Sequence, residues 1–372
     1  MSDSYSRAPE WITSDDHLRD WCARADGGRI LAIDTEFERQ RTYFAELCLI
    51  QVASSDAIAC IDTLALDGLD ALRALFAAPQ TTRILHAARQ DLEVLHHAGA
   101  PLAAPLLDTQ IAAALGGFND QIGYADLVYE LLGIALDKSQ TRTDWRRRPL
   151  SAAQLSYAAD DVRHLPAVAA SLCQRLEQLG RLPWLEEDCR NLNAVEVIDP
   201  PASEAWQRVK GLQGLPPAAF ARARTLATWR EGEARARDLP RGWVLKDSEL
   251  LVVALRAPHD VRALGRVLEG NPAFVRRHGD ALLEVLENAP DETTAMPQSA
   301  GPPTPAQRER AKTCAGHLKA RAAELGLQPA VLLTRREIEA IVSGRLPPRL
   351  REGWRAQVLD GLLDEFLAPA AA

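Results

Sequence analysis

The stretch ILAIDTEFER, which runs from Ile30 to Arg39, reads as a buried strand that ends in two acids. Its first four residues are apolar, and Asp34 and Glu36 then follow one residue apart. Because side chains at positions i and i+2 of a strand point to the same face, the two carboxylates are expected side by side. Their like charges repel each other, and burial increases that cost. The stretch therefore predicts that a positive charge lies close to this strand end.

The region around this strand, up to about residue 190, mixes strand and helix patterns. Residues 47–53 (LCLIQVA) and 57–62 (AIACID) are apolar runs separated by a short turn, as in a hairpin. Short strands and amphipathic helices then alternate as far as a long helix predicted over about 151–180, with Ser151 as its N-cap and Gln154 at the capping-box position. Together these patterns predict an α/β mixed sheet with antiparallel and parallel parts, flanked by helices.

After about residue 195 the strand patterns almost disappear. Two proline-rich linkers, residues 197–203 and 287–307, bracket two helical segments that share a faint internal similarity. We therefore expect an α/β domain over residues 1–193 and two small all-α domains over 204–288 and 304–369. Four tryptophans of the helical half are expected as core anchors: Trp206, Trp229, Trp243 and Trp354.

The composition is that of an ordinary globular protein, with 47% hydrophobic and 25% charged residues. No apolar run is long enough to span a bilayer, and the polar, acidic start of the chain does not resemble a signal peptide, so no membrane association is expected. The six cysteines include no C-x-x-C pair, which argues against a disulfide framework or a zinc site and favours the cytoplasm. A net charge of −8 gives no indication of nucleic-acid binding, but a local basic groove can lie on an acidic protein.

Further acids are placed where an α/β sheet can bring them to Asp34 and Glu36. Asp91 lies in the first turn of a helix that follows a strand, and Tyr157 and Asp161 lie at i and i+4 on one helix face. Clustered carboxylates are the ligands that Mg²⁺ and Mn²⁺ prefer. Each residue also has an ordinary interpretation, because a single D-x-E is usually solvated, Asp91 suits a helix N-terminus and Tyr157 suits half-buried packing. The ordered set is what favours a metal site.

These motifs resemble those of a known superfamily. DTEFER, the H-x4-D of His86 to Asp91 and the Y-x3-D of Tyr157 to Asp161 look like the three motifs of the DEDDy 3′–5′ exonucleases. Within it, LLDTQIAAAL, DKSQTRTDWRRRPLS and QLSYAADDV resemble the ribonuclease D family. Residues 226–255 are similar to the helicase-and-RNase-D C-terminal (HRDC) domain, and the last segment fits a second, more diverged copy. The resemblance covers nearly the whole chain.

The resemblance implies a ribonuclease-H-like exonuclease domain whose carboxylates hold two divalent ions, Mg²⁺ or Mn²⁺. By matching position, the metal ligands would be Asp34, Glu36, Asp91 and Asp161, and Tyr157 would orient the attacking water. The implied reaction is hydrolytic removal of 3′-terminal nucleotides with release of 5′-monophosphates. The family's substrates are structured RNAs, notably tRNA precursors, and no obligate protein partner is expected.

A basic stretch just before the tyrosine motif is a candidate for contacts with RNA phosphates. It contains Lys138, Arg142, Arg146, Arg147 and Arg148. We expect Lys138, Arg142 and Arg146 to contact substrate, although a solvated loop with incidental arginines is the alternative. Phe37 is expected to stack on a terminal base, with packing in the core as a nearly equal alternative. A weaker RNA-binding face in the helical half is the other candidate, with a charged helix exterior as its alternative, and it would use Arg222, Arg224, Arg230, Arg235 and Arg237.

Two other functions remain open from the sequence. A DNA 3′–5′ exonuclease would carry the same acids, but no phosphate-binding G-x4-G-K-[ST] motif of a helicase follows here. A non-catalytic RNA-binding protein would have no reason to keep five clustered catalytic groups. An RNA exonuclease is therefore the main interpretation.

Overall fold

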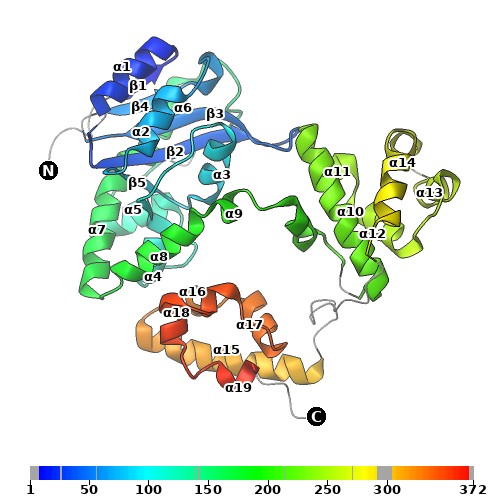
Figure 1. The fold of residues 1–372 in the computed structure, drawn as a ribbon. Coiled ribbons are helices and arrows are strands. Elements are labelled where there is room, and N and C mark those ends of the chain that lie inside the picture. The colour runs from blue at the N-terminus through cyan, green and yellow to red at the C-terminus, as the bar shows by residue number, and fades with distance from the viewer. Residues whose placement is uncertain are drawn as a thin grey trace.

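The computed structural model describes residues 8–25, 27–55, 57–137, 139–140, 143–212, 214–269, 271–290 and 304–367 of the 372-residue chain. A sheet domain is followed by two helical units, and α9 (Val195–Ile198) lies in the stretch that leads from the sheet domain to the first of them (Figure 1).

The sheet has six strands in the order β1-β4-β3-β2-β5-β6. Their bounds are β1 (Glu10–Ile12), β2 (Ile30–Glu38), β3 (Glu46–Ala53), β4 (Ile58–Ile61), β5 (Thr82–Leu85) and β6 (Leu106–Asp108). β2, β3 and β4 are antiparallel to their neighbours in this group, whereas β5 and β6 extend the sheet in parallel and β1 pairs in parallel with β4. The predicted mixed sheet is confirmed, and the strand that carries the acids lies in its interior.

Helices cover both faces of the sheet, as the period of two along β2 requires. Leu31 and Ile33 pack with helices α1 (Asp15–Ala25), α2 (Asp70–Ala77) and α3 (Arg89–His97). Ala32 points the other way and packs with α6 (Ala152–Arg163) and α7 (Leu165–Gln178). Asp34 and Glu36 share the parity of Ala32, so β2 directs them toward α6.

The single long helix predicted over about 151–180 is wrong, because two helices occupy this region. Ser151 caps α6 and forms the predicted capping box with Gln154. The chain then breaks at His164, where α6 ends and α7 begins. Pro166 explains the break, since it has no N–H to bond to the carbonyl four residues earlier and its ring collides with that carbonyl.

The first helical unit has its own apolar core and is formed by residues 202–287. It contains the 3₁₀ helix η3 (Ala202–Arg208) and helices α10 (Pro217–Ala236), α11 (Arg241–Val244), α12 (Asp247–Arg256), α13 (Val261–Val267) and α14 (Pro272–Glu287). Trp206 and Trp229 pack against the core, but Trp243 is 62% exposed and is not the core anchor predicted. Its place in the short helix α11, which buries only Val244, leaves the indole in solvent.

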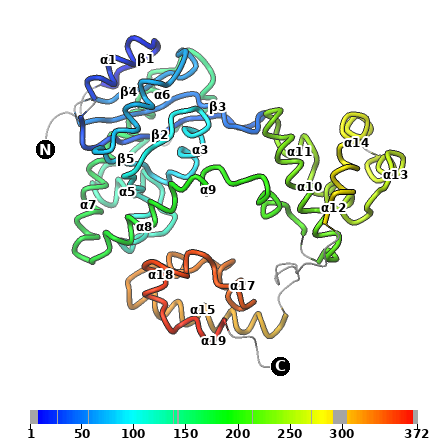
Figure 2. Tube along the Cα trace, viewed as in Figure 1, coloured from blue at the N-terminus to red at the C-terminus, as the bar shows by residue number. Residues whose placement is uncertain are grey.

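Tyr43, in the loop between β2 and β3, joins this unit to the sheet domain. Its hydroxyl donates to Glu231 at 2.5 Å and accepts from Arg235 and Arg241, both at 3.0 Å. The loop reaches across to α11 in Figure 2. Arg235 is therefore committed to this junction, and Arg230 is 3% exposed and bonded to Asp247, so neither presents the RNA-binding face considered for them.

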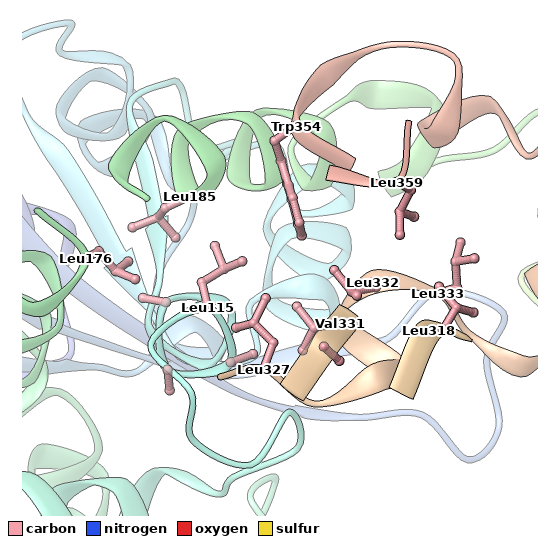
Figure 3. Close-up of a cluster of buried hydrophobic side chains, with 14 of the residues drawn as sticks. Leu115, Leu176, Leu185, Leu318, Leu327, Val331, Leu332, Leu333, Trp354 and Leu359 are labelled. Carbon is pink, nitrogen blue, oxygen red and sulfur yellow. The ribbon is translucent and has the colours of Figure 1, made fainter. Parts of the chain in front are cut away.

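The second helical unit shares a core with the sheet domain. It comprises α15 (Pro305–Leu325), α16 (Pro329–Leu332), α17 (Arg335–Val342), η4 (Pro348–Leu350), α18 (Gly353–Val358) and α19 (Asp364–Leu367). Its apolar side chains join those of α4 (Thr109–Leu115), α5 (Tyr124–Leu132), α7 and α8 (Leu182–Leu192) in one cluster. Figure 3 shows Leu327 and Val331 beside Leu115 in this cluster.

A buried ion pair and stacked tryptophans fasten the same interface. Trp354, which is buried as predicted, stacks on Trp184 with ring centroids 4.4 Å apart and an interplanar angle of 8°. Arg355 donates two hydrogen bonds to Asp188, at 2.5 and 2.8 Å, and the Trp354 indole donates a third at 3.1 Å. The last unit is thus packed firmly against the sheet domain.

None of the helices in the described part of the chain combines the length and the apolar content needed to cross a bilayer.

Candidate active site

Three of the predicted ligands meet between β2 and α6. One carboxylate oxygen from each of Asp34, Glu36 and Asp161 lies within 4.8 Å of the others. The two acids of β2 share one face of the strand, and Asp161 reaches them from the helix packed on that face. The sequence prediction that these acids converge is consistent with this geometry.

Asp91 joins the group from the first turn of α3. Its side chain is 7% exposed, and the hydroxyl of Thr35 donates a 2.5 Å hydrogen bond to it. Its charge acts on both acids of β2, since it raises the pKa of Asp34 and of Glu36. Asp91 therefore belongs to the same electrostatic cluster, although the group of three within 4.8 Å does not include it.

Tyr157 lies one helical turn before Asp161 on α6. Its hydroxyl hydrogen-bonds to Asp161, which lowers the pKa of that acid against the larger opposing effect of burial. The phenol ring lies next to Trp145, with centroids 6.1 Å apart, and Trp145 is 4% exposed. The i, i+4 spacing read from the sequence thus places a hydroxyl beside a ligand candidate.

Burial raises the pKa of all four acids, and nearby negative charges add to its effect. Burial is the largest cause for each, and it raises the pKa of Glu36 to about 8 and those of Asp91 and Asp161 to about 7. Asp34 is raised well above its ordinary value, because Asp91, Asp161 and Glu36 add to the effect of burial. Four acids in this state are held together at a cost that a cation would remove.

These shifts make the stability of the metal-free protein depend on pH. An acid whose pKa is raised on folding keeps its proton longer in the folded state, so stability falls as pH rises from the unfolded pKa of about 4 through the folded values. We expect the Tm in chelator to fall between pH 4 and 8, and Mg²⁺ to restore more of it at pH 8 than at pH 5. Glu36→Gln should show a smaller fall, and identical pH profiles for the two proteins would contradict the assignment.

The donor set fits the divalent ions that the family implies. Carboxylate oxygens without histidine or thiolate suit Mg²⁺ or Mn²⁺. Asp34, Glu36, Asp91 and Asp161 would hold them, and the positive charge would offset the repulsion predicted for the strand end from the sequence. The raised pKa values are the observation that supports this fit.

The residues predicted to contact substrate have different surroundings. Phe37 is partly buried and packs against the core formed with α1, α2 and α3, after a register shift that separates it from Glu36. The Arg146 side chain is about half exposed, and its Nε lies 3.0 Å from Oε2 of Glu46. Lys138 and Arg142 lie outside the described residues. Contacts between these four residues and substrate stay predictions.

Two residues support the site. From the sequence, Asp108 is expected to cap the helix over TQIAAAL and is a candidate for supporting the ligands, whereas Thr35 was not singled out. Thr35 orients Asp91, and Asp108 accepts hydrogen bonds from the backbone of Ala87 and Ala88 besides capping α4 as predicted. Ala87 has a positive φ of 56°, a conformation that costs energy for a residue with a Cβ. Asp108 thus stabilises the turn that leads into the helix carrying Asp91. For Thr35, the only indication in the sequence is its place between Asp34 and Glu36.

Comparisons with known proteins show which family the chain resembles. A family model described as 3′–5′ exonuclease matches residues 9–177, and one described as HRDC domain matches residues 219–286. Ribonuclease D of Xanthomonas oryzae pv. oryzae is 37% identical over 368 residues, which cover 98% of this chain and 100% of the relative. Ribonuclease D of Gluconacetobacter diazotrophicus is 37% identical over 97% of this chain and 92% of its own length.

A solved structure extends the likeness to the whole fold. The crystal structure of Escherichia coli RNase D, described as an exoribonuclease involved in structured RNA processing, has a TM-score of 0.85 and 31% sequence identity. The match covers 97% of this chain and 99% of that one. All five candidate catalytic positions fall inside the region that matches the exonuclease model. The chain belongs to the ribonuclease D family of 3′–5′ exoribonucleases.

Proposed function

We propose that this chain trims the 3′ ends of structured RNAs such as tRNA precursors and releases nucleoside 5′-monophosphates. The observation that carries the proposal is the convergence of Asp34, Glu36 and Asp161 within 4.8 Å, beside Asp91 and with raised pKa values. Two bound Mg²⁺ or Mn²⁺ ions would supply the positive charge that stabilises the attacking and leaving oxygens of a phosphoryl displacement. These four acids are the proposed metal ligands.

The protein's own groups would position the water and the 3′ end. The Tyr157 hydroxyl is suited to orient the attacking water by a hydrogen bond, because it stands beside Asp161 on a rigid helix. Phe37 and the basic stretch with Lys138, Arg142 and Arg146 are proposed to contact the terminal nucleotide and its phosphates. Catalysis would then rest mainly on positioning and electrostatics.

We also propose that the domains divide as 1–193, 204–288 and 304–369, with the last a diverged HRDC-like copy. The helical order supports a copy, because α10 and α15 have 20 and 21 residues and each is followed by a four-residue helix. In both units, a glutamate then accepts the N-cap N–H of the next helix, Glu249 in α12 and Glu337 in α17. We place the protein in the cytoplasm, without an obligate protein partner.

An assay with three substrates tests this function. With Mg²⁺ or Mn²⁺, we expect stepwise removal of nucleotides from a 3′-extended tRNA, and release of 5′-monophosphates seen by chromatography. Chelator should abolish the reaction, and a 3′-phosphorylated RNA should resist it. Faster degradation of a DNA oligonucleotide of matched sequence would favour the DNA exonuclease instead. RNA binding without hydrolysis under every metal condition would favour the non-catalytic alternative.

A further inference from the structure

Gln51 of β3 is buried without hydrogen-bond partners. Its exposure is 0%, and within the described part of the chain neither its amide nitrogen nor its amide oxygen has a partner. Buried amides in folded proteins are almost always hydrogen-bonded, because an unmade bond leaves the full desolvation cost. Such an uncompensated group in the core needs an explanation, and functional sites are where a cost of this kind is expected.

The strand register places Gln51 next to a proposed ligand. Gln51 is directly opposite Asp34 on β2 and directly opposite Cys60 on β4. Directly opposed side chains share a face of the sheet and have Cβ atoms about 4.5–5.5 Å apart. The Gln51 side chain therefore lies in the layer between the sheet and α6, at the level of the acids.

Of these two neighbours, Asp34 is the one left for Gln51. The thiol of Cys60 is directed to the backbone oxygen of Leu155 on α6, at 3.9 Å. The Asp34 carboxylate accepts a hydrogen bond from the backbone of Thr35. None of the side-chain hydrogen bonds found within the described residues involves Asp34. An amide without an acceptor thus stands across from a carboxylate without a side-chain donor.

The other ligands show what is missing at Asp34. Asp91 accepts from the Thr35 hydroxyl and Asp161 from the Tyr157 hydroxyl. Carboxylates that bind metals are generally held by hydrogen bonds of this kind, and removing the donor weakens metal binding. Gln51 has the right chemistry for the same task, since an amide N–H donates to a carboxylate in any ionisation state.

We propose that Gln51 is a positioning residue whose amide N–H donates to the Asp34 carboxylate when a divalent cation occupies the site. This inference rests on the proposed function, because it assigns Asp34 as a ligand. Gln51 acts through Asp34 and does not touch substrate. The amide oxygen of Gln51 stays without a partner, and a buried oxygen without a hydrogen bond costs less than a buried N–H without one.

The test uses the full chain with Gln51→Met, which keeps the size of the side chain and removes the amide. Because an unpartnered amide is replaced by an apolar group, the Tm of the metal-free protein should rise by about 2 °C or more. The Kd for Mn²⁺, measured by calorimetry and by electron paramagnetic resonance, should rise about 10- to 100-fold. A gain in stability together with a loss of metal affinity is not what a merely structural residue would give.

One further variant sharpens the result. Ile50→Val is the matched control, because Ile50 is 0% exposed on the opposite face of the same strand. It should lower the Tm slightly and leave the Kd for Mn²⁺ unchanged.

Either of two outcomes would overturn the role of Gln51. An unchanged Kd for Mn²⁺ in Gln51→Met would show that the amide does not support the ligand. A fall in the Tm of the metal-free Gln51→Met protein would show that the amide has partners, such as a buried water, and would remove the basis of the inference. Failure of the wild-type protein itself to bind Mn²⁺ would instead count against the proposed metal site.

Discussion

Asp34→Asn should lower RNA hydrolysis on the order of a thousandfold or more, because the substitution removes a proposed metal ligand and its negative charge from the acid cluster. The same change should raise the Tm of the metal-free protein, since Asp34 is repelled by Asp91, Asp161 and Glu36. Single-turnover hydrolysis of a 3′-extended RNA in Mg²⁺, together with thermal unfolding in chelator, measures both effects. A more stable but inactive protein is the expected result.

Tyr157→Phe is the matched comparison for the loss of RNA hydrolysis in Asp34→Asn. It keeps the ring beside Trp145 but removes the hydroxyl that meets Asp161. We expect turnover to fall about 100-fold or more while RNA affinity changes little, because the water and not the RNA backbone loses its partner. Near-wild-type hydrolysis by Asp34→Asn would refute the ligand assignment, and an equal loss of RNA affinity in Tyr157→Phe would refute the role of the hydroxyl.

Asp188→Ala should destabilise the protein by about 3–5 kcal/mol, because it leaves the Arg355 charge buried and unpaired. The side chains of Arg355 and Asp188 are only 8% and 11% exposed, and the indole N–H of Trp354 loses its acceptor in the same substitution. The midpoint of urea unfolding, followed by circular dichroism, measures this change in the free energy of unfolding.

Glu186→Ala is the control for Asp188→Ala. Glu186 is an exposed acid on the same helix, so its removal should change stability by no more than about 0.5 kcal/mol. Equal losses in the two variants would mean that the ion pair contributes little and that the apolar cluster alone fastens the last helical unit.

The sheet was predictable because its strands have recognisable local sequence patterns. Apolar runs, the turn after Ala53 and the alternating helices were enough for the mixed topology, and the Ser151 cap was read directly. The break at His164 was missed because the amphipathic pattern continues across the single proline at position 166. Packing inside the first helical unit was out of reach, and Trp243 on a four-residue helix and Arg230 beside Asp247 were therefore assigned to the wrong environments.

The acids were predictable for a different reason. Their identities and spacing carry the chemistry, so three short motifs located Asp34, Glu36, Asp91 and Asp161. The residues that hold them depend on contacts across the sheet or between helices, as with Thr35 and Asp91, which are 56 positions apart. A lone threonine or glutamine in a strand gives no sign of such a contact, and for Gln51 only the register reveals its neighbour.

The apolar cluster shared by the sheet domain and the last helical unit has a consequence for biosynthesis. The surfaces of α4, α7 and α8 that contribute Leu115, Leu176 and Leu185 are covered by residues made last, among them Leu327 and Trp354. While the chain is still emerging from the ribosome, these apolar surfaces have nothing to pack against. They stay exposed to solvent and can cause aggregation. The catalytic half can therefore reach its final form only after synthesis is complete. An mRNA truncated before the codon for residue 304 would yield a protein prone to aggregation.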